Sequence, residues 1–230
     1  MNSTDPSAPA GSHADEDAVP PSPAASLQLI DEQKRAARRR LDIDPALMLV
    51  PWGVAWLVGY GLFFLRFGPD ERVYVSMPEW LPLTVLLGLL CLAGAISGVA
   101  GVRAQHGVAG ESAERGTMYG LSWMVGFSTF VVLASRFDDL LPDRDAGLLW
   151  ASLPVLVTAI LYMSGGAVWR DRYQFGLGVW LSVANVAGLL AGPGWHSLVI
   201  CLAGGGGFLA TAAAYRLRAQ PQPGPATVGP

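Results

Sequence analysis

Two residues of this chain, Asn185 and His196, place polar side chains in or beside long apolar stretches. Asn185 stands near the middle of the apolar stretch 174–191, where its amide can bond to a neighbouring helix or bind a ligand. His196 follows in the sequence GPGWHS, and an imidazole titrates near neutral pH. We expect an interhelical contact at Asn185 and a solvated interfacial histidine at position 196, with a ligand role for either as the alternative.

The other residue types argue against an enzyme. The chain has one lysine, Lys34, with no Walker A sequence around it, and it has no HExxH, GxSxG or glycine-rich dinucleotide sequence. Its apolar stretches contain no carboxylate, which an aspartyl protease or a proton relay inside a membrane would require. Neither Cys91 nor Cys201 belongs to a CxxC or a Cys/His cluster, so we expect neither a metal nor a cofactor.

The distribution of charge indicates the class of protein. The chain has 230 residues, with 15 basic and 18 acidic side chains. None of these charges falls within six apolar stretches, which are 47–65, 81–102, 118–135, 147–169, 174–191 and 195–215. At about 1.5 Å per residue, each stretch is close to the length that crosses a hydrocarbon core about 30 Å thick. The pattern predicts an all-α, polytopic membrane helix bundle with six transmembrane helices. It excludes an ordinary soluble enzyme, a nucleic-acid-binding domain and a disulfide-rich secreted domain.

The basic residues predict the orientation of this bundle. If the N-terminus is cytoplasmic, eleven basic residues lie in inside segments and four lie in outside loops. Cytoplasmic loops carry the excess of lysine and arginine in membrane proteins. We therefore expect a multi-pass protein of the cell membrane with both termini in the cytoplasm.

Polar segments flank the predicted membrane domain, which covers residues 47–216. Residues 1–26 and 217–230 are rich in proline and poor in apolar side chains, which is typical of disordered tails. Residues 27–46 resemble a short helix ahead of the membrane. Its basic side chains, which can contact anionic lipid, are Lys34, Arg35, Arg38, Arg39 and Arg40. A topology signal with no further role is the alternative explanation of this run.

Part of the sequence repeats at an offset of 67 residues. The segment GVAWLVGYGLF begins at Gly53, and the similar segment GLSWMVGFSTF begins at Gly120. Matching pairs include Trp56 with Trp123 and Gly59 with Gly126. Because the offset covers two helices, the sequence predicts repeated two-helix hairpins that run parallel to one another.

Small residues recur at a spacing of four, which lets helix backbones approach closely in a membrane. The glycines expected at such helix contacts are Gly59, Gly126, Gly94, Gly98, Gly188 and Gly192. The run from Gly204 to Gly207 predicts another close contact, with a hinge or an unwound substrate site as the alternative.

Three segments together resemble a group of small actinobacterial polytopic membrane proteins without an assigned activity, often labelled "transporter". These segments are LDIDPALMLVPWGVAWLVGYGLFFLRFGPD, YGLSWMVGF and the ending GPGWHSLV followed by AGGGG. The resemblance covers most of residues 27–216. It implies an integral membrane protein and supplies no catalytic or binding residues.

Two classes of function fit these observations. The first is a non-enzymatic permease, or the membrane subunit of a transporter that relies on a separate cytoplasmic subunit for ATP hydrolysis. The second is a membrane interaction or sensing protein with no transport path, which the scarcity of polar groups inside the apolar stretches favours. Neither class predicts a nucleic-acid partner.

Overall fold

The computed structural model describes residues 22–29, 32, 44–105 and 111–219, and these residues form helices and turns without a strand. The chain divides into two units, residues 1–42 and 43–230. In the first unit, residues 23–29 are helical, and the Ser22 hydroxyl accepts a hydrogen bond from the Ala25 amide (3.2 Å). This helix begins four residues before the start predicted at residue 27, because Ser22 supplies a cap inside the expected tail. The basic residues from Lys34 to Arg40 lie outside the described residues.

The second unit contains six helical spans that are long and apolar enough to cross a membrane. The prediction of a six-helix membrane bundle is therefore confirmed, and the protein is an integral, multi-pass membrane protein. Five spans are single helices: α2 (Pro45–Arg66), α3 (Trp80–Gln105), α4 (Glu111–Asp138), α5 (Asp143–Trp169) and α6 (Arg172–Ala191). The last span consists of α7 (Trp195–Val199), the π-helical segment η2 (Ile200–Gly205) and α8 (Gly206–Ala219). A short 3₁₀ turn, η1 (Pro69–Glu71), lies between α2 and α3.

Local sequence signals set several helix ends. The Asp44 carboxylate accepts a hydrogen bond from the Ala46 amide (2.9 Å), and Pro45 takes the first helical position of α2. The predicted start of the membrane domain at residue 47 is therefore two residues late. Asp171 caps α6 in the same way, accepting from two backbone amides. At the other boundary, α8 continues to Ala219, three residues into the segment predicted as a tail.

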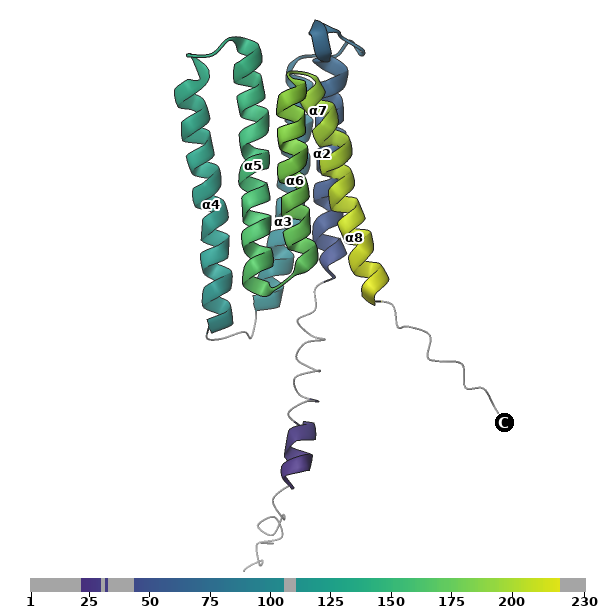
Figure 1. The fold of residues 1–230 in the computed structure, drawn as a ribbon, viewed down its shortest axis with the longest axis vertical. Coiled ribbons are helices and arrows are strands. Elements are labelled where there is room, and N and C mark those ends of the chain that lie inside the picture. The colour runs from purple at the N-terminus through teal and green to yellow at the C-terminus, as the bar shows by residue number, and fades with distance from the viewer. Residues whose placement is uncertain (1–21, 30–31, 33–43, 106–110, 220–230) are drawn as a thin grey trace, which may run out of the picture. The chain divides into compact units, whose positions relative to one another are not determined.

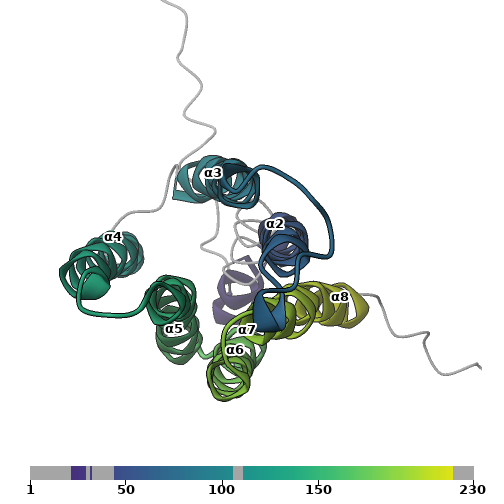
Figure 2. The ribbon, with the colours of Figure 1, turned by 90° about the horizontal axis from the view of Figure 1, so that it is seen from above.

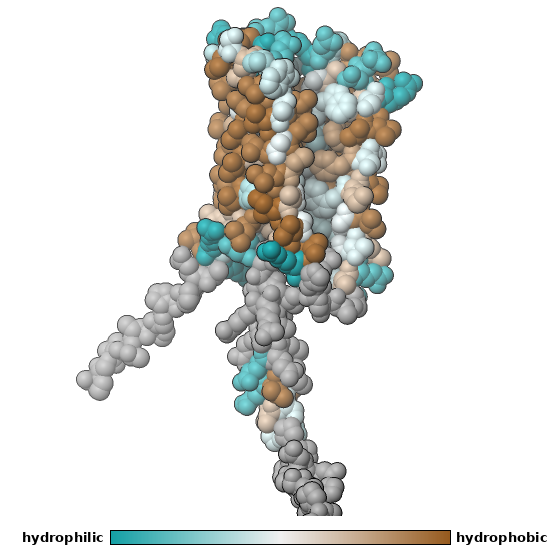
Figure 3. All heavy atoms as spheres, turned by 180° about the vertical axis from the view of Figure 1, so that it is seen from behind, coloured by the Kyte–Doolittle hydropathy of each residue, from teal (hydrophilic) through white to brown (hydrophobic). Residues whose placement is uncertain are grey.

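The six spans lie side by side, and α2 begins at the same end of the bundle at which α8 ends (Figure 1). We call this the terminal end, and the opposite one the η1 end. Seen along the bundle, the spans form an open arc, with α3 beside α2 at one end and α4 beside α5 at the other (Figure 2). The face drawn in Figure 3 carries a broad apolar band between hydrophilic ends. This band is the surface that a bilayer covers.

The apolar core is formed mainly by α2, α5, α6 and the last span. Its largest fully buried apolar side chains include Phe208, Leu181, Ile200 and Val155. α3 contributes Leu86, and α4 contributes no residue to this cluster. Accordingly, α3 and α4 bury the smallest share of their residues among the six spans. The bundle therefore has a packed part with two lightly packed helices at its periphery.

The repeated segments form the same row of ring contacts on α2 and α4. Ring centroids lie 5.6 Å apart for Trp56–Tyr60 and 6.0 Å apart for the equivalent pair Trp123–Phe127. The next ring centroids along each helix lie 6.5 Å apart for Tyr60–Phe63 in α2 and 6.1 Å apart for Phe127–Phe130 in α4. The centroid spacings thus repeat, but the ring orientations do not, because the interplanar angles are 57° and 43° in α2 against 11° and 89° in α4.

Two close approaches between spans rest on glycine: Gly178 of α6 packs on the backbone of α5, where a Cβ atom would lie 2.6 Å from the Ala159 carbonyl oxygen, and the glycine run of the last span meets α2. A Cβ atom placed on Gly205 would lie 2.7 Å from Leu57 Cγ and 3.0 Å from the Gly53 carbonyl oxygen. A Cβ on Gly204 would lie 2.7 Å from the Trp56 ring. The segment stays helical, in a π conformation, so the predicted close contact is present here, and the chain is not unwound. Gly206 differs, because no described atom lies within 4 Å of the corresponding position.

The other predicted contact glycines fall into two groups. A Cβ atom on Gly59 would lie 2.4 Å from Leu86 Cδ1, and one on Gly126 would lie 3.1 Å from Val157 Cγ1, so both glycines face a neighbouring helix. At Gly94 and Gly98 no described atom comes within 4 Å. The contact predicted at these two positions is wrong for a single chain, because they lie on the face of α3 that turns away from α2.

We expect glycine-to-alanine variants of the two groups to differ in thermal stability. Gly59→Ala forces a methyl group against Leu86, and such overpacking typically costs about 1–3 kcal/mol. Gly94→Ala and Gly98→Ala meet open space, so the midpoint temperature of unfolding in detergent should stay the same or rise. Gly126→Ala should lower it less than Gly59→Ala does. A loss at Gly94 as large as that at Gly59 would contradict this assignment of faces.

Candidate functional site

Four polar side chains are buried within the described residues: Ser152, Thr158, Asn185 and His196. The Thr158 hydroxyl donates to the Pro154 carbonyl oxygen of its own helix (2.7 Å). The Ser152 hydroxyl also bonds within its own helix, to the Leu149 carbonyl oxygen (3.4 Å), whereas the side chains of Asn185 and His196 meet each other beside the Ser152 backbone carbonyl. We call Ser152, Asn185 and His196 the polar cluster.

The polar cluster joins three helices through one amide. Asn185 Nδ2 donates to the Ser152 carbonyl oxygen (3.1 Å), and Asn185 Oδ1 lies 2.9 Å from His196 Nε2. Since Asn185 Nδ2 donates to a carbonyl oxygen, the atom of Asn185 that faces the imidazole is the acceptor Oδ1. His196 must therefore donate, so its proton is on Nε2. Asn185 and His196 expose 3% and 1% of their surfaces. The interhelical contact predicted at Asn185 is therefore present, and its partners are Ser152 and His196.

The prediction that His196 is solvated is wrong. The tight turn between α6 and α7 has positive φ angles at Gly192 (89°) and Gly194 (83°), and it folds the imidazole back onto α6. A Cβ atom on Gly188 would lie 2.8 Å from His196 Cδ2, so this glycine makes room for the ring. At Gly192 no described atom lies within 4 Å of the Cβ position; this glycine instead ends α6 with a positive φ angle (89°), which residues with a side chain rarely adopt.

One atom of the polar cluster has no partner. His196 Nδ1 is buried and forms no hydrogen bond with any described residue. In the tautomer set by Asn185, this nitrogen is an acceptor. A buried acceptor without a donor is uncommon in folded proteins.

Aromatic side chains tie other helices together, a role that sequence reasoning missed. Trp52 Nε1 donates to Ser97 Oγ of α3 (3.0 Å), and Tyr60 donates to the Ala151 carbonyl oxygen of α5 (3.3 Å). Trp180 Nε1 donates to the Ala203 carbonyl oxygen of η2 (2.7 Å). The available signal is that a buried tyrosine such as Tyr60, which exposes 7% of its surface, needs a partner for its polar atom, whereas Trp180 exposes 50% and gives no such signal. The sequence alone cannot name that partner.

The cluster has a limited chemical repertoire. The described residues contain no group of three His, Cys, Asp or Glu side chains that could hold a metal ion. The imidazole and the amide can orient each other and exchange hydrogen bonds with a small ligand. No protein family, curated protein or solved structure matches this chain.

The hydrogen bond between Asn185 and His196 should appear as coupling in a double-mutant cycle. Either single change, Asn185→Ala or His196→Ala, leaves the other side chain without its partner. Hydrogen bonds between membrane helices typically couple by about 0.6 kcal/mol, with a maximum near about 1.7 kcal/mol. We expect a value in this range from the unfolding free energies of the wild type, both single variants and the double variant.

Thr158→Ala provides the matched control for this cycle. Its hydroxyl is buried but bonds within its own helix, so Thr158→Ala and Asn185→Ala should add without coupling. Additive behaviour of Asn185→Ala and His196→Ala would contradict the contact.

Proposed function

We propose that this integral membrane protein is a non-enzymatic interaction or sensing protein, with no solute path through its own bundle. The observation that carries the proposal is the state of the buried polar side chains. In the described residues these side chains bond to one another or to the backbone, with the single exception of His196 Nδ1. A permeation path instead needs polar groups that face water or solute.

The packing of the interior supports the same proposal. A row of aromatic contacts crosses the bundle, from Trp56 to Phe208 (5.1 Å) and from Phe208 to Tyr162 (5.5 Å). The row continues from Tyr162 to Trp123 of α4 (5.8 Å). These rings connect α2, α8, α5 and α4 through continuous side-chain contacts.

The proposal includes two partners that the sequence predicts. The basic residues from Lys34 to Arg40 precede the bundle and would contact anionic lipid. A separate cytoplasmic subunit would bind at the membrane face that carries them. We also propose that the chain is related to the small actinobacterial polytopic membrane proteins that it resembles.

A second candidate function, a small permease or the membrane subunit of a transporter, is favoured by two observations. His196 Nδ1 is a buried acceptor without a partner, and the π-helical η2 follows α7 in the same span. Single π-helical turns are frequent at functional sites. Under this alternative, a small solute would donate a hydrogen bond to the imidazole.

Permeability measurements on the full chain in liposomes separate the two functions. We expect shrinking and swelling rates in glycerol, urea and potassium chloride gradients to equal those of protein-free liposomes. A rate that depends on the protein, falls in Asn185→Ala and persists in Thr158→Ala would support the permease. The Thr158→Ala control shares the burial of Asn185 but does not touch His196.

We also propose that both termini are cytoplasmic, on the basis of the arginine distribution. In a background lacking Cys91 and Cys201, single cysteines at Ser76 and Asp143 should react with an impermeant thiol reagent in intact cells. A cysteine at Ser112 should react only after the membrane is opened. All three side chains are exposed, so accessibility does not depend on local burial. Labelling of Ser112→Cys in intact cells would overturn this orientation.

A further inference from the structure

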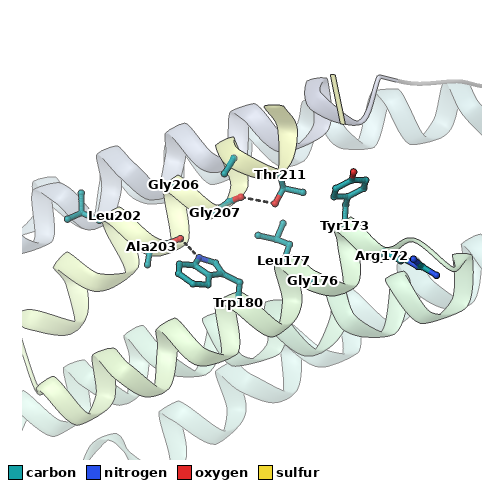
Figure 4. Close-up of a pocket in the computed structure, with 11 residues that line it drawn as sticks. Arg172, Tyr173, Gly176, Leu177, Trp180, Leu202, Ala203, Gly206, Gly207 and Thr211 are labelled. Carbon is teal, nitrogen blue, oxygen red and sulfur yellow. Dashed lines mark hydrogen bonds between the residues drawn. The ribbon is translucent and has the colours of Figure 1, made fainter. Parts of the chain in front are cut away.

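An open groove of about 370 Å³ runs along the bundle surface between α6 and the last span. Its walls are mainly apolar, and Arg172 and Leu202 lie at opposite ends of it (Figure 4). Two of its lining glycines, Gly176 and Gly206, have no described atom within 4 Å of the position where a Cβ atom would stand. Open space therefore adjoins both glycines on the groove wall.

The length of the groove corresponds to one leaflet of a bilayer. From Arg172 to Trp180, α6 rises about 12 Å, at about 1.5 Å per residue. Half of a hydrocarbon core about 30 Å thick is about 15 Å. The groove starts at the terminal end of the bundle, where α6 begins, and extends toward the middle of the membrane-spanning region.

Positive charge gathers at the terminal end of the groove. Arg172 lines the groove, and the Arg218 guanidinium lies 5.8 Å from the ring centroid of Tyr173, another lining residue. Among the described residues, neither arginine forms an ion pair, whereas Arg216 pairs with Asp44 (3.4 Å).

The nearby carboxylate is already engaged. Asp171 accepts hydrogen bonds from the amides of Tyr173 and Gln174 and from the Tyr215 hydroxyl. Its oxygens are therefore committed to capping α6 and anchoring α8. The two arginines remain available to an anion that arrives from the membrane surface.

We infer that this groove binds one anionic phospholipid of the leaflet at the terminal end. The phosphate lies between Arg172 and Arg218, and an acyl chain lies along Leu177, Trp180 and Leu202. The charge at one end, the apolar walls and the one-leaflet length match the three parts of such a molecule. The inference stands whether or not the protein recruits a cytoplasmic subunit.

A transmembrane helix of a partner or of a second copy is the alternative occupant. We favour the lipid because Arg172 and Arg218 place positive charge at the end of the groove, where an anionic headgroup meets it.

Lipid binding to the full chain tests the inference, with native mass spectrometry as the readout. Phosphatidylglycerol and phosphatidylcholine with identical acyl chains are offered to the detergent-solubilised protein. We expect one tightly held phosphatidylglycerol and at least about tenfold weaker binding of phosphatidylcholine, since two basic residues each attract an anionic headgroup. Equal binding of the two lipids would overturn the inference.

Filling the groove should abolish this binding while leaving the fold intact. Gly176→Leu with Gly206→Leu places two side chains in open space, so the thermal midpoint should not fall. The matched control is Gly88→Leu with Gly101→Leu on α3, where likewise no described atom lies within 4 Å of either Cβ position. Retention of the lipid in the filled groove, or equal loss in the control, would contradict the proposal.

Removing the charges tests the headgroup contact separately. Arg172→Gln should weaken phosphatidylglycerol binding about fivefold, and adding Arg218→Gln should bring the loss to about 30-fold. Soluble glycerol phosphate should not displace the lipid, because it has no acyl chain for the groove. Displacement by glycerol phosphate, or a dimer that disappears in the groove-filling variant, would overturn the inference in favour of a free phosphate or a second copy.

Discussion

The close approach of α2 to the last span is the constraint on which the rest of the bundle depends. Gly53 and Gly205 face each other so closely that a Cβ atom on either would lie within about 3 Å of the opposite helix. Lipid supplies no hydrophobic drive between helices, so contact at short range has to hold them together. The π-helical η2 provides that contact, and Cys201 adds a hydrogen bond to the Leu57 carbonyl oxygen (3.2 Å).

The polar side chains follow from this arrangement. Once α2 and the last span are fixed, Trp56 and Phe208 meet in the core, and the turn before α7 brings His196 against α6. The polar atoms of Asn185 and Trp180 then find partners on neighbouring helices. Polar groups here mainly join helices, which is why we favour an interaction protein over a permease.

The sequence predicts the number of spans well, because charges are costly inside a bilayer and the six apolar stretches contain none. It also singles out Asn185 and His196, but it does not pair them, since the pairing depends on the turn geometry at Gly192. The glycine predictions show a similar limit. A spacing of four identifies small residues on one face of a helix, as at Gly59 and Gly94, but it does not say whether a neighbour covers that face.

Two adjacent glycines offer the most direct test of the account. Gly205 packs against α2, whereas Gly206 lines the open groove. Each of the two is flanked by a glycine on both sides. The measurement is the unfolding free energy in detergent of Gly205→Ala and of Gly206→Ala. We expect the free energy of unfolding to fall by about 1–3 kcal/mol in Gly205→Ala and not to fall in Gly206→Ala. Equal values for the two variants would contradict the claim that the contact between α2 and η2 holds the bundle together.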